Sequence, residues 1–440
     1  MLEIFDHRLI NSIGRMLNPD RVKEIMLDPN SQNPDPHWSF EKKWNPLSLS
    51  EGYPGILILL AETQRNQLMP MDEAIHAYVL RIKEKIEAEG LEPDLSLYSG
   101  VAGICFALSL VSCERTRYQK MLTKLEEYLL KQIDKEYLQP MEECLKNKLP
   151  IFVKYYDPIQ GLSGIGRYLL ENRSQDKMME GALQITEMLI KLTQPIVIEG
   201  HEVPGWFVSE KDPLNYRMQK EKGNFNLGLA HGVTSILSYL SIASLKGINL
   251  KGQREAIERM VFWLKSKSFT KNKATVWPSH VSWEDEINSV NHSLPTRDAW
   301  CYGTPGVART LYLAAKALNN QDLSSFAQKA FHGIFERTFD QWDIPAPTVC
   351  HGVAGLLIIT KEMAKDDASL NVEVEKLRQH LYSVYQDESA FGFRDIEPCR
   401  QGGYISLDKI GFLEGCVGTI LSLLPTSQKG SPWHLPLMIS

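Results

Sequence analysis

Short apolar runs alternate with charged stretches along the chain, and this alternation predicts helices. Apolar runs follow Gly52, Gly100 and Gly161, and charged stretches with helical spacing come next, as at residues 72–88 and 178–192. Apolar residues at every third or fourth position indicate a helix with one buried face, whereas uninterrupted apolar runs indicate helices buried nearly all round. Each repeat is therefore expected to supply one buried helix and one exposed helix.

A Gly-x-x-Gly turn opens the apolar runs and recurs through the whole chain, which identifies an internal repeat. In one copy Ser235 replaces the second glycine, and a serine fits there if its backbone φ is negative. The leading glycines are Gly52, Gly100, Gly161, Gly232, Gly303, Gly352 and Gly415. Helix pairs of this kind bury their apolar faces by stacking, as an open solenoid or as a closed ring. The apolar inner helices favour the ring, so the predicted fold class is all-α, a double-layered α/α toroid.

Two stretches depart from the helical pattern. The β-branched residues of Pro195–Val208, arranged around a glycine, predict a hairpin, and Thr275–Trp283 has a weaker pattern of the same kind. We therefore expect a small strand-containing insertion at residues 194–224. The repeat otherwise runs through nearly the whole chain, so residues 1–440 are expected to form a single toroid domain.

Composition and charge exclude several classes of protein. The chain has 440 residues, of which 43% are hydrophobic and 23% charged, as is typical of globular proteins. A net charge of −6 without a basic run argues against a nucleic-acid partner. The apolar runs are too short to span a bilayer, and the N-terminus lacks the features of a signal peptide. The seven scattered cysteines do not suggest a disulfide framework. These features predict a cytoplasmic protein with reduced thiols.

A register of polar residues and cysteines precedes the leading glycines. The residue just before the glycine is polar in all seven repeats: Glu51, Ser99, Gln160, His231, Tyr302, His351 and Glu414. In a toroid these positions would surround one mouth of the barrel. One position earlier, cysteine occurs twice, as Cys301 and Cys350 in consecutive repeats. Because consecutive repeats are spatial neighbours, these two cysteines and His351 are a candidate zinc site.

The composition of this candidate set predicts a catalytic metal. Three protein ligands with a fourth position open are typical of catalytic zinc, whereas structural zinc normally has four. An open zinc site lowers the pKa of a bound water or thiol, and two thiolate ligands suit a sulfur ligand in the open position. We therefore expect one zinc ion per chain.

Three motifs resemble the lanthionine synthetase C-like family, the lantibiotic cyclases: Gly228–Gly232, Trp300–Gly303 and Cys350–Gly355. The resemblance covers nearly the whole chain and is strongest to the stand-alone cyclases of the nisin and subtilin pathways, subtilin first. It implies a toroid of seven inner and seven outer helices. It also implies zinc-dependent addition of precursor-peptide cysteine thiols to dehydroalanine or dehydrobutyrine, which forms lanthionine and methyllanthionine rings. The implied partners are a dehydrated precursor peptide with its leader and a complex with a dehydratase and an ABC transporter at the membrane.

The resemblance also implies roles for seven residues. The zinc ligands correspond to Cys301, Cys350 and His351, and the catalytic residues to His231, Asp157, Arg297 and Tyr302. Arg297 would stabilise the enolate that forms when the thiolate attacks, and His231 would protonate the α-carbon. Asp157 would orient His231 or help to deprotonate the thiol, and Tyr302 is an alternative proton carrier.

Other interpretations remain open for these residues. His231 also suits a hydrogen-bonded core position, Asp157 a helix cap, and Arg297 a surface ion pair. Glu51 and Glu414 would suit the carboxylate pair of a glycosidase, although nothing in the sequence fixes their separation. A non-catalytic zinc scaffold that binds a peptide or thiol is a further alternative. It would keep the three metal ligands but would not need the histidine and aspartate.

Overall fold

The apolar runs that follow the leading glycines form helices, and nearly every residue of these helices is buried. The computed structural model describes residues 6–34, 44–91, 94–112, 115–218, 222–290, 294, 296–399, 402–425 and 432–440. Their contacts group the chain into two units. The first unit consists of Met1–Asp94, Tyr98–Leu125 and Ile344–Trp433, and the second of Leu95–Leu97, Glu126–Asp343 and His434–Ser440.

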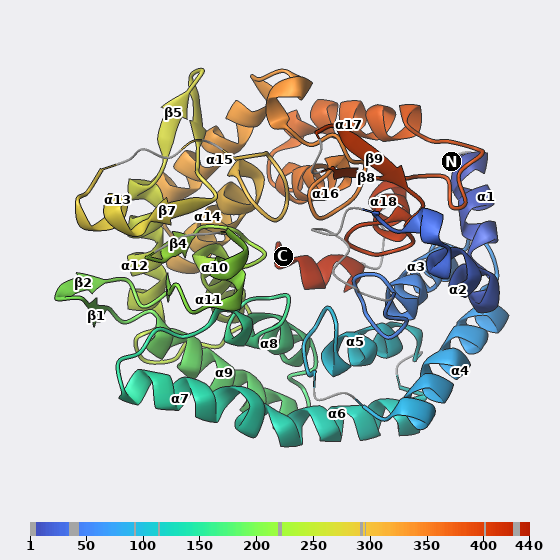
Figure 1. Cartoon of the computed structure of the whole chain (residues 1–440), viewed down its shortest axis with the longest axis horizontal. Helices are drawn as coiled ribbons and strands as arrows, with labels where there is room; N and C mark the ends of the chain where they lie inside the picture. Colours follow the sequence, from blue (N-terminus) through green and yellow to red (C-terminus); the bar gives the residue numbers. More distant parts are fainter. Residues whose placement is uncertain are drawn as a thin grey trace. The chain divides into compact units, whose positions relative to one another are not determined.

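Four buried helices form the inner layer of the first unit. They are α3 (Tyr53–Arg65), α5 (Val101–Val111), α16 (Val353–Ala364) and α18 (Cys416–Leu423). Contacts join α16 to α18, α18 to α3 and α3 to α5, so the four lie side by side in that order (Figure 1). Amphipathic helices cover them: α4 (Asp72–Glu89) packs on α3, and α17 (Asn371–Ser383) packs on α16.

The remaining elements of the first unit are short. They are α1 (His7–Arg15), α2 (Pro19–Leu27), η1 (Pro29–Ser31), η5 (Ala368–Leu370), and the antiparallel strands β8 (Asp395–Pro398) and β9 (Tyr404–Leu407). The boundary between the two units falls within two elements, namely α6 (Gln119–Ile133) and the 3₁₀ helix η6 (Pro432–Leu437). In the part of the chain that the structure describes, no helix is long and apolar enough to cross a membrane.

The second unit repeats the same two-layer construction. Its inner helices are α8 (Leu162–Glu171), α11 (Val233–Leu245) and α14 (Thr304–Leu318), and contacts join them in this order. Its outer helices are α9 (Asp176–Leu192), α12 (Gln253–Ser266) and α15 (Gln321–Phe335), which pack on α8, α11 and α14 respectively. These pairs confirm the predicted alternation of one buried and one exposed helix.

The leading glycine of each repeat is required by close packing. All seven are the N-cap of an inner helix, and a Cβ at any of them would come within 3.0 Å of a backbone atom. Among the seven, Gly303 alone also has a positive φ, of 99°. Ser235 lies inside α11, outside the positive-φ region, and its hydroxyl donates to the Gly232 carbonyl at 2.7 Å. The serine is therefore accommodated without strain.

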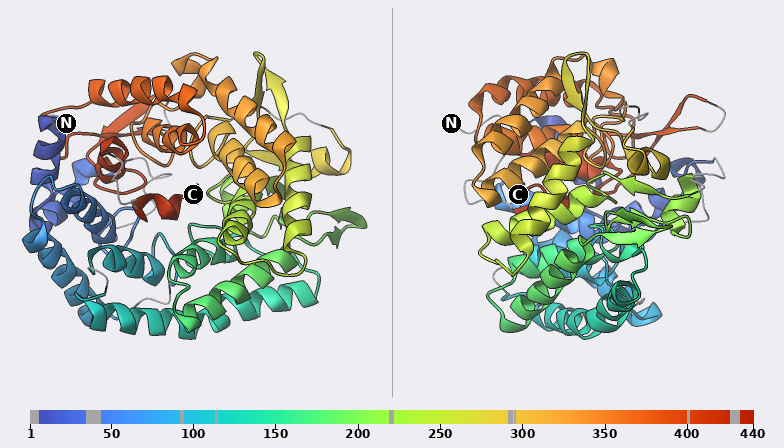
Figure 2. Two further views of the ribbon diagram at one scale, coloured as in Figure 1. Left: turned by 180° about the vertical axis from the view of Figure 1, so that it is seen from behind. Right: turned by 90° about the vertical axis from the view of Figure 1, so that its left-hand side faces the viewer.

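Strands in the second unit project from its helices (Figure 2). Strands β1 (Ile196–Ile198) and β2 (His201–Val203) form the hairpin expected in Pro195–Val208. Its two turn residues both have positive φ, as in the turns that suit the twist of a hairpin. The other elements are β3 (Phe207–Val208), β4 (Asn224–Asn226), β5 (Phe269–Lys271), β6 (Ala274–Val276), β7 (His280–Ser282), α7 (Gln139–Lys146), α10 (Pro213–Met218), α13 (Trp283–Ile287), η2 (Asp134–Leu138), η3 (Val153–Tyr155) and η4 (Phe339–Trp342).

The second predicted hairpin is wrong in its pairing. Thr275–Trp283 does contain strand residues, but β6 pairs with β5, whereas β7 pairs with β4 in the sheet β3-β4-β7. The strands in this stretch therefore find their partners elsewhere, because pairing is decided by tertiary packing. Residues 219–221 of the predicted insertion lie outside the described residues. A single domain with an insertion at residues 194–224 stays a prediction.

Candidate metal and catalytic centre

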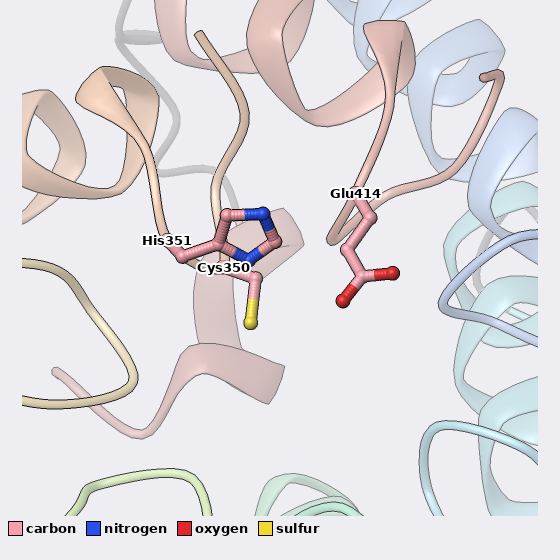
Figure 3. A group of neighbouring side chains, drawn as sticks. All are labelled: Cys350, His351 and Glu414. Atoms are coloured by element: carbon pink, nitrogen blue, oxygen red, sulfur yellow. The ribbon is translucent and has the colours of Figure 1, made fainter. Parts of the chain in front are cut away.

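The first unit brings a cysteine, a histidine and a carboxylate together at the start of two inner helices. Cys350 and His351 precede α16, and Glu414 precedes α18 (Figure 3). Their sulfur, nitrogen and oxygen ligand atoms all lie within 4.8 Å of one another. The two turns are joined because the backbone N–H groups of Val349 and Cys350 donate to the Leu413 carbonyl at 3.0 and 2.9 Å. A thiolate, an imidazole and a carboxylate at this spacing suit a zinc ion.

A buried aspartate lies behind His351. The Nε2 atom of His351 is 3.8 Å from an oxygen of Asp395 in β8, which is longer than a hydrogen bond. Asp395 is fully buried and accepts a hydrogen bond from the Thr348 hydroxyl at 3.2 Å. Burial raises the pKa of Asp395, while His351 and Lys409 beside it act to lower that pKa. The carboxylate therefore lies on the Nε2 side of the His351 ring.

Cys301 lies in the second unit, in the turn before α14. Its side chain is nearly buried, and its carbonyl accepts from the N–H groups of Leu229 and Ala230 at 2.8 and 3.3 Å. The turn that carries Cys301 is thereby attached to the turn that carries His231. This is the same connection that joins Cys350 to Leu413 in the first unit. The repeated register therefore specifies a repeated hydrogen-bond pattern.

His231 and Asp157 form a close pair in the second unit. The Nδ1 atom of His231 is 2.6 Å from one oxygen of Asp157, which is fully buried, whereas the His231 side chain is 27% exposed. The other oxygen of Asp157 accepts from the N–H groups of Gln160 and Gly161 at 2.6 and 3.1 Å. Asp157 therefore closes the turn before α8 and also holds His231, whereas the N-cap of α8 itself is Gly161, without a side-chain cap.

Tyr302 is held by contacts that the sequence did not reveal. Its hydroxyl accepts a hydrogen bond from the Asn226 side chain at 3.0 Å, and its ring lies 5.6 Å from the His280 ring. A Cβ at Gly228 would collide with the Tyr302 ring, which explains the glycine at that position. No pattern in the sequence marks Asn226, although it lies six residues before a leading glycine.

Arg297 is half-buried at the start of the segment that leads to Cys301. Its carbonyl packs against Gly303, where a Cβ would collide with it. The next residue, Asp298, is buried and pairs with Arg337 at 2.7 Å. Burial raises the pKa of Asp298, and Arg337 opposes that rise. The backbone at Arg297 is thus held by the packing on Gly303 and by the ion pair of the next residue.

The predicted residues fall into two groups. The first unit holds Cys350 and His351, whereas the second holds Cys301, Tyr302, Arg297 and the His231–Asp157 pair. Sequence reasoning placed Glu414 on the polar register but did not make it a candidate ligand. Asp395 was missed because it lies in a strand that the helical repeat does not predict.

Comparisons with known proteins identify the family. The sequence model for the lanthionine synthetase C-like protein matches residues 43–435, and the chain belongs to this family. The nisin biosynthesis protein NisC of Lactococcus lactis subsp. lactis is 28% identical over 365 residues, which cover 79% of this chain and 82% of that protein.

A solved structure confirms the fold class. The structure of nisin cyclase superposes with a TM-score of 0.78 at 23% sequence identity, over 99% of this chain and 98% of that one. The fold is therefore that of the family, and the predicted α/α toroid is confirmed. The resemblance to lantibiotic cyclases is confirmed as well, whereas the preference for subtilin stays a prediction.

Proposed function

We propose that this protein is a zinc-dependent lantibiotic cyclase, which adds cysteine thiols of a precursor peptide to dehydroalanine or dehydrobutyrine and so closes thioether rings. Membership of the family and the similarity to NisC support this activity. The observation that carries most weight is the pairing of Cys350 and His351 within reach of a single metal ion. A thiolate and an imidazole on adjacent residues are the donors that zinc prefers.

The zinc ligands in this proposal are Cys301, Cys350 and His351. Cys301 is assigned as a ligand by its repeat position and by the match to the family motif. Asp395 would position the imidazole of His351, since buried carboxylates commonly orient metal-bound histidines. When bound, zinc would lower the pKa of the substrate thiol and make it a nucleophile at neutral pH.

In this proposal, His231 transfers the proton that the enolate requires. Attack of the substrate thiolate on the β-carbon forms the C–S bond and leaves an enolate, whose α-carbon must then be protonated. Asp157 accepts from Nδ1 of His231, which directs Nε2 outward for proton transfer. The same arrangement of a buried acid behind a histidine sets the tautomer in other acid–base catalysts.

Two further residues are assigned by their match to the family. Arg297 would stabilise the negative charge that develops on the enolate oxygen, because a fixed cation acts where charge forms. Tyr302, held by Asn226, would be a second hydrogen-bond donor or proton carrier beside Cys301. The partners of the proposed enzyme are the dehydrated precursor with its leader, a dehydratase and an ABC transporter, which together would keep the protein at the membrane periphery.

The decisive experiment measures bound zinc in the wild type and in Cys301→Ala, together with thiol consumption on a dehydrated precursor peptide. One zinc per chain, lost in the variant along with cyclisation, is the expected result. Zinc that binds normally without any acceleration of cyclisation would favour the non-catalytic scaffold. Absence of zinc from the wild type would contradict the assignment of the ligands.

A further inference from the structure

The last residues of the sequence are bound by side chains of the second unit through their backbone. Met438 and Ile439 are fully buried, and every carbonyl from Leu437 to Ser440 accepts a side-chain hydrogen bond. The donors are Trp300 to Leu437 at 2.8 Å, Ser238 to Met438, Arg309 to Ile439 at 2.7 Å and Arg167 to Ser440 at 2.7 Å. The residues 434–440 are called the closing segment below.

Three of these donors occupy one register of the repeat. Arg167, Ser238 and Arg309 each lie six residues after a leading glycine, on the consecutive inner helices α8, α11 and α14. The same position is apolar in the other four repeats, all of which lie in the first unit: Ile58, Phe106, Ile358 and Leu421. At this position the side chain is therefore polar in the three repeats that donate hydrogen bonds to the closing segment and apolar in the other four.

These donors are costly to bury, which indicates a specific use. Arg167 and Arg309 are 1% and 4% exposed, and arginine is almost never fully buried unless it is paired. Arg167 also pairs with Glu171, and burial lowers its pKa. The closing segment carries strain of its own, since Met438 has a φ of 61°. A non-glycine residue stays in that conformation only where its surroundings hold it.

The closing segment contacts the turn that carries Cys301 through Trp300. This side chain is fully buried, precedes Cys301 directly, and donates its indole N–H to the Leu437 carbonyl. The Trp300 carbonyl packs on Gly306 at the start of α14, so the residue is fixed at both its backbone and its ring. A shift of the closing segment would therefore move Trp300, the residue next to Cys301.

We propose that the closing segment is a built-in positioning element for Cys301, and that Arg167, Ser238 and Arg309 form its receptor. The receptor donates hydrogen bonds to backbone carbonyls, so it recognises the path of the segment. Cys301 is held on one side by the Leu229 and Ala230 N–H groups and on the other by Trp300 and the closing segment. This inference rests on the proposed function, in which Cys301 is a zinc ligand.

The test uses the full-length chain with Ser238→Ala and Arg309→Met combined. Hydrogen exchange of residues 434–440, zinc affinity by chelator competition, and the thiolate-to-metal absorption band of the cobalt-substituted protein are measured. We expect faster exchange in the closing segment and zinc affinity lower by about tenfold, the range typical of lost support around a metal ligand. The cobalt band should weaken because Cys301 no longer holds the metal.

Two further variants separate positioning from general stability. Ile58→Ala changes the same register in the first unit, and should lower the melting temperature while zinc affinity and the cobalt band stay unchanged. Trp300→Phe removes the indole donor, and should weaken zinc binding while the other three donors keep the closing segment protected.

Each outcome has a definite meaning. Release of the closing segment with normal zinc affinity and a normal cobalt band would overturn this inference alone. A loss of zinc affinity no greater than that of Ile58→Ala at matched stability would do the same. Wild-type protein without zinc would overturn the proposed function, and this inference with it.

Discussion

The two units use the same turn to gather different side chains. In the first unit, the turns before α16 and α18 gather Cys350, His351 and Glu414, whose ligand atoms lie within 4.8 Å of one another and could hold a metal ion. In the second, the equivalent turns before α8 and α11 hold a buried aspartate against a half-exposed histidine. Both sets are fixed by glycine N-caps packed against backbone. The difference teaches that the repeat sets where a side chain lies, while the residue at that position sets what it does.

The inner helices of the two units also differ in the type of side chain two helical turns after the polar position. The first unit has apolar residues six positions after each leading glycine, whereas the second has two arginines and a serine. The apolar positions contribute packing, and the polar ones hold the closing segment. The same position of the repeat is therefore part of the apolar core in the first unit and donates hydrogen bonds to the closing segment in the second.

The largest effect is expected from loss of a metal donor in the first unit. Cys350→Ala should abolish zinc binding and slow cyclisation by roughly a thousandfold or more, because a bound metal supplies several kcal/mol of transition-state stabilisation. The measurements are zinc content and the rate of thiol loss on a dehydrated precursor. Cys416→Ala is the matched control, since this buried cysteine lies on an inner helix of the same unit outside the metal group. Its zinc content should match the wild type.

The second-largest effect separates the two units in function. His231→Ala should slow cyclisation by about 10²–10⁴-fold, the usual contribution of a general acid or base. Zinc content should stay at the wild-type value, because the proposed function assigns His231 to proton transfer and not to metal binding. Loss of zinc together with activity in this variant would break the distinction between the two regions.

A third prediction divides the two roles of Asp157. Asp157→Asn keeps an oxygen that can cap the turn but removes the charge that holds His231, so cyclisation should slow by roughly 10- to 100-fold with little loss of stability. Asp157→Ala removes both roles and should cost about 1 kcal/mol of stability in addition, the size expected for lost hydrogen bonds to the turn. Denaturant unfolding beside cyclisation rates measures both. Equal stability of the two variants would contradict the capping role.

The smallest effect concerns the frame that carries the metal donors. Lys361 of α16 donates to the Ser422 carbonyl at 2.6 Å, at the end of α18. Burial and, to a smaller extent, the positive charge of Arg378 lower the pKa of Lys361 to about 7. Since the folded pKa lies below the unfolded value of 10.5, protonation of Lys361 destabilises the fold, and stability should rise as pH increases from about 7 toward 10.5.

The test for Lys361 compares the unfolding free energy of the wild type with that of Lys361→Met across this pH range. The wild type should gain stability relative to the variant as pH rises. A difference that stays constant with pH would show that Lys361 is not desolvated in the folded protein. Zinc content should be the same in both at each pH, which separates this effect from that of the metal donors.

Much of the candidate centre was predictable because it follows the repeat. Cys301, Cys350 and His351 were found from their place before leading glycines, and His231 from its place on the polar register. Local periodicity also predicted the alternation of buried and exposed helices. Glycine was required at each turn by the approach of backbone, and this requirement leaves a regular mark in the sequence.

Contacts between distant segments followed from no local pattern. Asn226 supports Tyr302 from a strand, Asp395 approaches His351 from another, and β6 and β7 pair with strands outside the stretch that contains them. The sequence alone left Asp157 as either a cap or a partner of His231. In the structure one oxygen of its carboxylate accepts from the turn before Gly161 and the other contacts His231, while Gly161 is the N-cap of α8.

The sequence by itself determined the repeat, the helical fold class, the family and the residue types placed before each inner helix. These depend on spacing along the chain, which glycine and apolar residues encode directly. Tertiary structure alone decided which polar groups meet, as in the four hydrogen bonds that hold residues 437–440. Such pairs join residues up to 273 positions apart, and folding brings them together through packing that no short stretch specifies.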